Sequence, residues 1–572
     1  MKKILYIFLS LALQMAAFLP LRAQDRAAEK NNMDVVFVDA VQKYEDGSFR
    51  DALMLFDAIN ELDPTNDAAF YYTGLCRYYL GDAKGATEAM REAVRLDPKN
   101  YWYRDRLAVL YSFADQEELT IDIYESLLED YPKKTEIYYN LVNLYARQNQ
   151  LDKVMETLDH IETIRGKDET TTMARYDVLM HQDKPDEAFK VLVEFNEEYS
   201  SPQILCVMGD AKLSEYQDTL ALEYYNEALA IDSESAPAIL GKSEVYRMRR
   251  SYDEYFNCLN QFTSSSSVPA QMKSQYLDNL SQHLDPRFLQ LYQTQLDSLY
   301  NTGVRMHPTD STMLLTAGTY FFRSDRKDRA KDLFKSNSRL YPEDFNAVAM
   351  YIQSLSFSED WETLAMESED AFKTFPGEPA FLNMILMAHF NLEDYEAVIK
   401  DSERMAAAFP KDTTVVLAAY SSMGDCYHLL GNEKLSFKAY DNALKLDPGY
   451  APVLNNYAYY LSLTGKKLKK AYNMSKITVE QEPDNATYLD TFAWILHLQG
   501  KSLEAKSLFK HAMLYGGKES VAILDHYAEV LYTLGEYDLA GVYWNMAKQK
   551  NTDNEIPDLD QRVEERMKSI KK

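Results

Sequence analysis

The sequence predicts an all-α solenoid, which is a stack of short helix pairs, and a repeat of 34 residues is the main observation behind this prediction. Proline recurs at or near this spacing along the chain. Because proline cannot continue a helix, each proline of the series is expected just beyond the end of a second helix. The period predicts about 14 to 15 helix–turn–helix units between Met33 and Lys550. The prolines of the series are Pro64, Pro98, Pro132, Pro308, Pro342, Pro376, Pro410, Pro448 and Pro483.

Small residues recur at fixed places within each period. In the unit Asp67–Asn100, Gly74 is the eighth residue and Ala86 the twentieth, where small side chains let the two helices approach closely. Gly81 is the fifteenth, at the expected turn, where glycine tolerates a left-handed backbone. Each unit is therefore expected to contain two helices of about 14 residues joined by a tight turn.

The unit Leu417–Tyr450 shows the same pattern most completely. It carries Gly424, Tyr427, Gly431, Tyr440, Ala443 and Pro448. This pattern resembles the tetratricopeptide repeat (TPR) family, and the resemblance covers roughly nine-tenths of the chain. It implies a right-handed superhelix in which the first helices of the units line a concave groove.

The N-terminus has the composition of a secretory signal peptide. Lys2 and Lys3 precede an apolar stretch, Ile4–Leu21, and Ala23 is a small residue suited to the position before a cleavage site. We expect residues 1–23 to be removed and the mature chain to be periplasmic, with secretion as the alternative. A retained membrane anchor fits less well, because the stretch is short and contains a proline. No cysteine lies near the cleavage site, so a lipoprotein is not expected.

Loss of phase divides the repeats into two groups. The period is lost after Phe262, where the polar run Thr263–Pro269 is expected to be flexible, and it returns at Pro308. The sequence therefore predicts an N-terminal array at 33–268, an irregular helical joint at 269–310 and a C-terminal array at 311–550. Four additional residues before Leu417 indicate a longer loop or helix. Residues 555–572 carry an apolar stripe and are expected to form a capping helix.

Composition and motifs argue against several functions. The net charge of −28 disfavours binding to nucleic acid or to anionic membranes. The four cysteines are widely spaced and are expected to be small buried residues. No metal-binding, nucleotide-binding or nucleophile motif is present, so no cofactor, metal site or catalytic residue is predicted and the chain is not expected to be an enzyme.

The TPR resemblance places five positions of each first helix in the concave groove. In the early repeats, these positions are rich in aromatic residues, which suit extended peptides because they bury area beside polar groups. A second group lies in the late repeats. The candidate partner-binding residues are Tyr71, Tyr78, Tyr79, Trp102, Asp105, Phe113, Tyr139, Asn143, Arg147, Asn455, Tyr459, Asp490 and Trp494.

The leading hypothesis is a non-enzymatic scaffold of the bacterial cell envelope that binds proteins or peptides in this groove. Association with envelope complexes would follow from such a role. The alternative is a glycan-binding component of an outer-membrane nutrient-uptake system, because exposed aromatic rings also stack on sugars. The missing lipid-anchor cysteine and the regular repeats count against this alternative.

Overall fold

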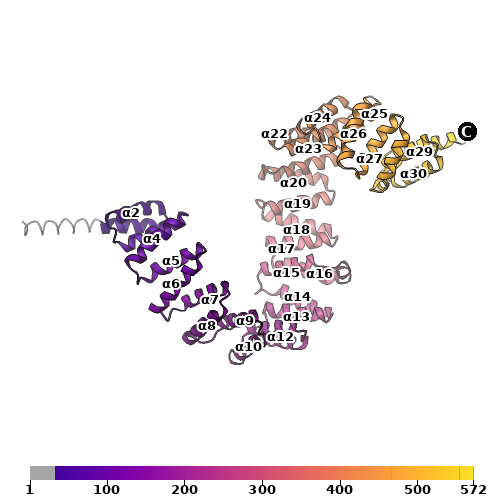
Figure 1. Ribbon diagram of the computed structural model, residues 1–572. Coiled ribbons are helices and arrows are strands. Elements are labelled where there is room, and N and C mark those ends of the chain that lie inside the picture. Colours follow the sequence, from indigo (N-terminus) through magenta and orange to yellow (C-terminus); the bar gives the residue numbers. More distant parts are fainter. Residues whose placement is uncertain (1–32, 466, 553, 571–572) are drawn as a thin grey trace, which may run out of the picture. The chain divides into compact units, whose positions relative to one another are not determined.

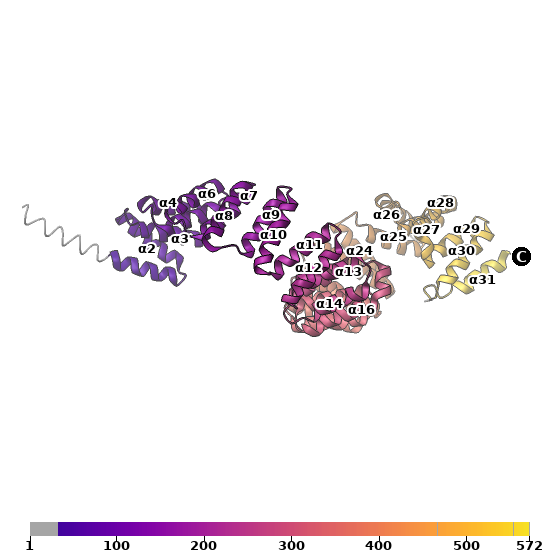
Figure 2. The same ribbon diagram turned by 90° about the horizontal axis from the view of Figure 1, so that it is seen from below.

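The computed structural model describes residues 33–465, 467–552 and 554–570, which form α-helices and one 3-10 helix and contain no β-strand. They divide into two compact units at the boundary between Phe262 and Thr263. Within each unit, consecutive helices pack side by side in chain order (Figures 1 and 2). The predicted all-α solenoid is confirmed. The predicted signal peptide, residues 1–23, lies outside the described residues.

The N-terminal unit begins with a helix over residues 33–45. The next helices in this unit are α2 (Phe49–Leu62), α3 (Asp67–Tyr79), α4 (Ala83–Leu96), α5 (Tyr101–Phe113), α6 (Glu117–Asp130), α7 (Thr135–Arg147), α8 (Leu151–Arg165), α9 (Glu169–His181), α10 (Pro185–Tyr199), α11 (Pro202–Ser214), α12 (Asp218–Ile231), α13 (Ala236–Met248) and α14 (Tyr252–Ser264).

The C-terminal unit continues the same alternation of first and second helices. Its helices are α15 (Ala270–Gln282), α16 (Pro286–Met306), α17 (Ser311–Arg323), α18 (Lys327–Leu340), α19 (Phe345–Phe357), α20 (Trp361–Thr374), α21 (Pro379–Asn391), α22 (Tyr395–Ala408), α23 (Thr413–Leu429), α24 (Glu433–Leu446), α25 (Ala451–Leu463), α26 (Leu468–Gln481), α27 (Ala486–Leu498), α28 (Ser502–Ala512), the 3-10 helix η1 (Gly517–Glu519), α29 (Val521–Thr533), α30 (Tyr537–Lys550) and α31 (Leu559–Ile570).

The turn inside most of the described helix pairs contains one residue in the left-handed region of backbone space. Gly81 and Gly431 occupy it with φ of +84° and +73°. Other repeats place a side chain there, as at Asp115 (φ +53°) and Tyr216 (φ +61°). An L-residue is strained in this conformation, so these repeats form the same turn at a cost in stability.

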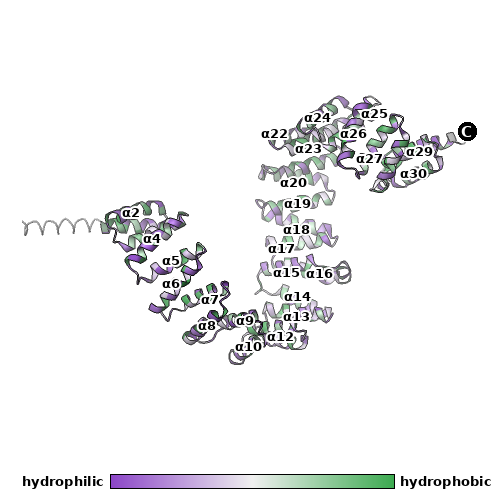
Figure 3. Ribbon diagram, in the orientation of Figure 1, coloured by the Kyte–Doolittle hydropathy of each residue, from purple (hydrophilic) through white to green (hydrophobic). Residues whose placement is uncertain are grey.

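Glycine at the eighth position brings the two helices of a pair into contact, as the pattern predicted. A Cβ atom on Gly424 would lie 2.2 Å from the ring of Tyr440, which is fully buried between α23 and α24. A Cβ atom on Gly318 would lie 2.5 Å from the ring of Phe334 in the same way. Each aromatic ring of the second helix thus packs directly against backbone of the first. Hydrophobic and hydrophilic residues are mixed along the helices of both units (Figure 3), because each helix buries only part of its surface.

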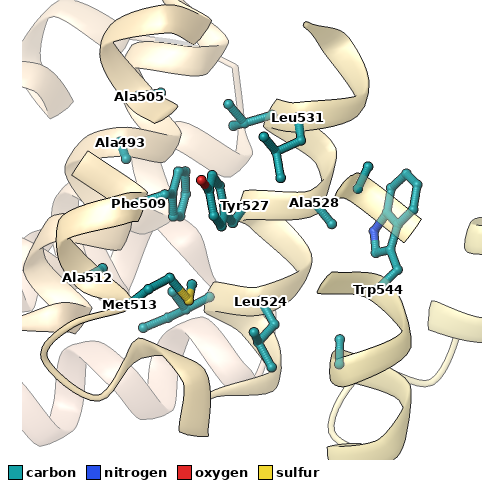
Figure 4. Close-up of a cluster of buried hydrophobic side chains, with 14 of the residues drawn as sticks. Ala493, Ala505, Phe509, Ala512, Met513, Leu524, Tyr527, Ala528, Leu531 and Trp544 are labelled. Atoms are coloured by element: carbon teal, nitrogen blue, oxygen red, sulfur yellow. The ribbon is translucent and has the colours of Figure 1, made fainter. Parts of the chain in front are cut away.

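The last repeats share one large continuous hydrophobic core. The rings of Phe509 and Tyr527 stack with centroids 5.3 Å apart, and Trp544 is fully buried beyond them (Figure 4). Leu559 and Val563 of α31 are buried against this core. Two residues of the apolar stripe, Leu559 and Val563, thus pack on the core of the last repeats, and the capping role of residues 555–572 stays a prediction.

The segment predicted to be a joint, residues 269–310, contains two helices of the C-terminal unit. α15 is regular, and α16 has non-helical backbone angles at Tyr292. In the polar run before α15, Val268 is buried, and the fully buried Lys273 donates a hydrogen bond of 2.5 Å from its Nζ atom to the carbonyl of Ser265. These contacts restrict the backbone of the polar run 263–269, although its composition predicts flexibility. The proposed limits of the two arrays and of the joint stay predictions.

The four additional residues before Leu417 lengthen a helix rather than a loop. α23 has 17 residues, whereas the neighbouring first helices α21 and α25 have 13. Asp412 caps the added turn by accepting hydrogen bonds from the backbone amides of Thr414 and Val415. The first helix of this repeat therefore starts one turn earlier than those beside it.

Candidate aromatic pocket

Two first helices of the N-terminal unit, α3 and α5, carry a group of exposed aromatic side chains. Asn66 and Asn100 cap these helices through their side-chain oxygens, which fixes where each helix begins. Tyr78 is 39% exposed and Tyr79 is 56% exposed. Phe113, at the end of α5, is 68% exposed. Such rings cost free energy in water unless a partner covers them.

These rings contact one another rather than standing alone. Phe49 of α2 stacks on Tyr79 with ring centroids 4.5 Å apart and an interplanar angle of 10°. The rings of Tyr78 and Phe113 are 5.8 Å apart and link α3 to α5. Deeper in the unit, the ring centroids of Tyr71 and Tyr103 are 4.9 Å apart. The contacts restrict the rings before any ligand arrives, which lowers the entropic cost of binding.

Between these helices lies a pocket of about 420 Å³, which we call the aromatic pocket. Its volume is at the small end of the range of roughly 300–1,000 Å³ that is usual for ligand sites. The lining includes Gly74, where a Cβ atom would lie 3.1 Å from the Met90 side chain and 3.2 Å from the Ala86 carbonyl oxygen, so glycine lets α4 pack closely against α3. The aromatic pocket is lined by Tyr44, Tyr71, Gly74, Leu75, Tyr78, Tyr79, Met90, Arg106, Val109, Leu110 and Phe113.

The hydroxyl group of Tyr44 is one of the polar groups of this pocket. Burial raises the pKa of Tyr44 to about 12, and the neighbouring Tyr79 and Tyr71 act in the same direction. Tyr44 is therefore a neutral phenol at physiological pH, able to donate a hydrogen bond. The guanidinium of Arg106 is the cationic group among the lining residues.

Trp102 and Asp105 lie on α5 outside the lining of this pocket. Trp102 is 57% exposed, and the Lys134 ammonium lies 5.8 Å from the centroid of its ring and 3.8 Å from that of Tyr101. Asp105 is half-buried; burial raises its pKa, while the charges of Arg106 and Lys134 oppose that rise. These two candidates extend the exposed surface beside the pocket.

The three candidates on α7 do not line the pocket. The Tyr139 hydroxyl donates a long hydrogen bond of 3.5 Å to Asp168, and Arg147 forms an ion pair of 3.2 Å with Glu117. Asn143 is exposed. The structure therefore brings together Tyr71, Tyr78, Tyr79 and Phe113, and leaves the candidates on α7 apart from them.

The late candidates differ, because Asn455 and Asp490 are buried and Tyr459 and Trp494 are only partly exposed. Asp490 on α27 is 6% exposed and accepts a hydrogen bond of 2.9 Å from Nδ1 of His526 on α29. Trp494 stacks on the same imidazole with centroids 4.2 Å apart. Burial opposes a charge on His526, but the attraction of Asp490, their hydrogen bond and the charge of Asp525 raise its pKa overall.

α31 contributes to this network from beyond the last repeat. Arg562 donates two hydrogen bonds, of 2.7 and 3.1 Å, to the buried carboxylate of Asp525. That carboxylate also accepts a hydrogen bond of 3.0 Å from the indole of Trp544. Arg566 pairs through one nitrogen with one carboxylate oxygen of Glu529, one turn along α29. We call the side chains of Asp490, Trp494, Asp525, His526, Glu529, Trp544, Arg562 and Arg566 the C-terminal network.

Asn455 and Tyr459 on α25 border the C-terminal network. The ring centroid of Tyr459 lies 6.1 Å from that of His526, and burial together with Asp490 and Asp525 raises the pKa of its hydroxyl. Asn455 is 4% exposed, and its Oδ1 atom has no hydrogen-bond partner within the described chain, nor does Nε1 of Trp494. These atoms are covered by protein. The late groove positions therefore present fewer accessible polar groups to a partner than the sequence predicts.

Sequence reasoning missed Tyr44, Phe49 and Arg106 as parts of the early site. Tyr44 and Phe49 belong to the preceding repeat, to which the predicted groove positions do not extend, although its aromatic residues are visible in the sequence. Arg106 is the residue after the groove position Asp105 and lies on the side of α5 that faces α3. The C-terminal network was missed because its partner residues, Arg562 and Arg566, lie outside the repeats.

Metal and membrane features are not found within the described ranges, 33–465, 467–552 and 554–570. No group of three or more His, Cys, Asp or Glu side chains there has a spacing that could hold a metal ion. No helix there combines the length and apolar character needed to cross a bilayer. All four cysteines are buried and unpaired, as expected for small core residues.

Comparison with known families identifies the repeat. Sequence models of the tetratricopeptide repeat match residues 41–101 and 417–450. The chain contains tetratricopeptide repeats. Residues 41–101 include Tyr44, Phe49, Tyr71, Tyr78 and Tyr79, so these five aromatic side chains of the site lie within the matched repeat segment. The TPR resemblance inferred from proline and glycine spacing is thereby confirmed for these segments.

Two curated proteins are similar over part of the chain. TPR repeat-containing protein MJ1428 of Methanocaldococcus jannaschii is 25% identical over 167 residues, which is 24% of this chain and 29% of that protein. Cellulose synthase operon protein C of Pseudomonas fluorescens is 26% identical over 129 residues, which is 23% of this chain and 10% of that protein. The chain thus spans well under half the length of each of these relatives.

Solved structures give alignments of high coverage but low similarity. The Cut9–Hcn1 hetero-tetramer of the APC/C aligns over 87% of this chain and 96% of that chain, with 14% identity and a TM-score of 0.32. The structure of Naa15/Naa10 bound to HypK-THB aligns over 94% and 97%, with 12% identity and a TM-score of 0.31. At these scores we draw nothing from them about function.

Proposed function

We propose that the protein is a non-enzymatic scaffold of the bacterial cell envelope, which binds segments of partner proteins at the aromatic pocket of its N-terminal unit. The observation that carries this proposal is the pocket itself, bordered by half-exposed rings of Tyr79 and Phe113 on TPR helices. Surfaces of this kind are typical of protein interfaces, because aromatic rings bury much area at a low cost in side-chain entropy. TPR domains in general bind other proteins, which agrees with this role.

The site contains side chains suited to binding, and its polar side chains are phenols and one guanidinium. Tyr44 is kept neutral by burial, and no His, Asp, Glu or Cys is among the described lining residues of the pocket. General acid–base catalysis most often uses one of these groups, and a phenol with a raised pKa is only a weak acid at neutral pH. The pocket therefore supports recognition of a partner without chemical change.

A pair of substitutions tests the proposed role. Affinity capture from the native envelope, with quantitative mass spectrometry, should recover a partner set with the wild-type protein. The double variant Tyr79→Ser/Phe113→Ser should lose that set by about tenfold or more, because the two rings are expected to be binding hot spots. Leu503→Ser is the matched control, since Leu503 is 72% exposed in the C-terminal unit. Recovery of the same proteins with both variants would contradict the proposal.

The cellular address is part of the proposal and has its own test. The basic and apolar pattern before Gln24 supports export and cleavage after Ala23. Expression in a bacterium with two membranes, followed by fractionation and N-terminal sequencing, should give a periplasmic protein that begins at Gln24. A product that keeps Lys2 and Lys3 in the membrane fraction would contradict this part.

Glycan binding is the second candidate, because the exposed rings of Tyr78, Tyr79, Trp102 and Phe113 could also stack on sugar rings. A glycan array with the full chain separates the two functions. Binding to a glycan that is lost in Tyr79→Ser/Phe113→Ser, without capture of a protein partner, would favour this candidate over the scaffold.

A further inference from the structure

The charge of the aromatic pocket differs from that of the chain around it. The chain carries 89 Asp and Glu residues and a net charge of −28. Among the residues that line the pocket there is no Asp or Glu, and there is one guanidinium, that of Arg106. A ligand in the pocket thus meets a cation and several phenol hydroxyls in an otherwise acidic protein.

Two other pockets of the same unit are lined by acidic side chains, unlike the aromatic pocket. A pocket of about 450 Å³ is lined by four carboxylates, and its Arg77 pairs with Asp57 at 3.5 Å. A pocket of about 440 Å³ is lined by Asp115, Glu117 and Glu118. Both are shaped by the acidic surface that is expected of this composition, whereas the aromatic pocket is not.

Arg106 also differs from its neighbours in its pairing. Arg104, on the same helix, donates hydrogen bonds of 2.5 Å to Asp130 and 2.7 Å to Ser126. Arg91 donates a hydrogen bond of 2.6 Å to the hydroxyl of Tyr111. Arg106 forms no ion pair within 4.0 Å with a carboxylate of the described chain, although its charge acts on the adjacent Asp105 and opposes the rise in the pKa of that carboxyl. Its charge is therefore available to a ligand.

From this arrangement we infer the chemistry of the partner: the aromatic pocket takes an aromatic or large aliphatic side chain that stands directly beside an Asp or Glu in the partner sequence. The apolar side chain fills the space between Leu75, Tyr78 and Phe113, and the neighbouring carboxylate pairs with Arg106. This inference rests on the proposed function, since it names the kind of segment that the same pocket binds. The small volume fits one or two residues of an extended segment rather than a folded surface.

A cationic ligand is the opposite expectation, and it has physical grounds. Aromatic rings attract cations through their faces, and the net charge of −28 attracts them from a distance. At contact distance, however, a Lys or Arg of a partner would meet the unpaired charge of Arg106 with no carboxylate of the lining to offset it. Local charge then decides in favour of an acid, because screening weakens the distant charges more than the near one.

The test uses the full mature chain and three fluorescent heptapeptides that differ only at the centre: Asp-Phe-Asp, Lys-Phe-Lys and Asp-Ala-Asp between Gly-Ser flanks. Asp-Phe-Asp should bind about tenfold more tightly than either other peptide, and its affinity should fall as salt increases. Arg106→Gln should lower the affinity for Asp-Phe-Asp by about tenfold and bring it close to that of Lys-Phe-Lys. Arg287→Gln, at an exposed position of the C-terminal unit, should leave all three affinities unchanged.

Several outcomes overturn the inference. These are equal or tighter binding of Lys-Phe-Lys, an unchanged affinity of Arg106→Gln, and no binding by any peptide up to about 1 mM, an affinity of only about 4 kcal/mol. Binding of an oligogalacturonate in place of the peptides would assign the pocket to an acidic glycan. Self-association of the chain, abolished by Arg106→Gln in sedimentation experiments, would assign it to a second copy.

The two proposals fail separately. If Tyr79→Ser/Phe113→Ser loses its envelope partners but Arg106→Gln keeps them, the scaffold stands and the acidic partner is wrong. If neither variant changes the captured proteins, the proposed function itself is wrong. Circular dichroism of each variant confirms that the helices are intact, as expected for substitutions of exposed side chains.

Discussion

The aromatic pocket and the C-terminal network occupy equivalent places in the repeat, yet one is open and the other is filled. Tyr71 and Asp490 are both fifth residues of a first helix, but Tyr71 lines a pocket whereas Asp490 is buried beside His526. The difference comes from the next repeat along the chain in each case. Near the pocket the neighbouring side chains leave about 420 Å³ unfilled, while in the last repeats His526 and Arg562 occupy the corresponding space. The position in the repeat therefore predicts which way a side chain faces. The side chains of the next repeat determine whether a pocket remains beside it.

The largest effect is expected from Asp525→Ala in the C-terminal network. This change leaves Arg562 and the indole of Trp544 without their acceptor, and breaking a buried ion pair typically costs roughly 3–5 kcal/mol. Urea unfolding followed by circular dichroism should show a loss of about 3 kcal/mol. Asp105→Ala beside the aromatic pocket should cost less than about 1 kcal/mol, since Asp105 is only half-buried. Equal losses would remove the distinction between the two regions.

A smaller difference in stability is expected between phenylalanine substitutions at two tryptophans of the C-terminal unit. Trp544→Phe removes a hydrogen bond of 3.0 Å to a buried carboxylate and should cost about 2 kcal/mol. Trp494→Phe keeps a ring beside His526 and removes an indole nitrogen that has no partner within the described chain. It should cost less than about 1 kcal/mol. Thermal unfolding of both variants checks the order, and a larger loss for Trp494→Phe would show that its nitrogen is paired in solution.

The stability of the C-terminal unit should also depend on pH through His526. Its pKa is raised in the folded state, so the pairing with Asp490 contributes stability below the ordinary histidine pKa of about 6.5, and this contribution is lost as the pH rises through the raised value. His497 acts in the opposite sense: burial and the charge of His526 lower its pKa, so its contribution is lost as the pH falls.

Arg562, Asp525 and Tyr459 also face His526; Arg562 is a strong base and burial raises the pKa of the Tyr459 hydroxyl, so neither of these two titrates near neutrality. Stability measured from about pH 6 to about pH 8 in wild type and His526→Gln isolates the contribution of the histidine. The decline with rising pH should be smaller in His526→Gln, and identical slopes would show that His526 is not charged in the folded protein.

The smallest effect on stability is expected at the aromatic pocket. Phe113→Ser replaces a side chain that is 68% exposed, so the free energy of unfolding should change by no more than about 0.5 kcal/mol. Its effect should appear in binding instead. A loss of about 3 kcal/mol would mean that Phe113 belongs to the core, and the pocket would then no longer differ in kind from the C-terminal network.

Much of the fold could be predicted because it depends on contacts inside one repeat. Gly424 and Tyr440 lie 16 positions apart in the same unit, so their packing is visible in a single period of the sequence. The exposed rings of Tyr78, Tyr79 and Phe113 were predicted for the same reason. The state of Asp490 and Trp494 could not be predicted in this way, since it depends on His526 in the next repeat.

One signal for the C-terminal network was nevertheless present in the sequence. Asp525 and Glu529 are four residues apart, and so are Arg562 and Arg566, which matches one turn of helix with complementary charge. Reading α31 as another first helix would have paired these residues. The polar run around Ser265 shows the opposite outcome. Its composition predicts a flexible backbone, but the buried side chain of Val268 and the hydrogen bond from Lys273 fix its position, and no local sequence pattern reveals these contacts.

The pairing of α31 with α29 also has a consequence for how the array can grow or shrink by gene duplication. Among the last three first helices, α29 presents an acid at both positions, whereas α27 presents Asp490 and Trp494, and α25 presents Asn455 and Tyr459. If the final repeat were deleted, Arg562 would still meet an acid but Arg566 would meet an indole. Loss of the last repeat alone would therefore remove the ion pair between Arg566 and Glu529, whereas duplication of that repeat, or gain or loss of an earlier unit, would leave acids opposite both arginines.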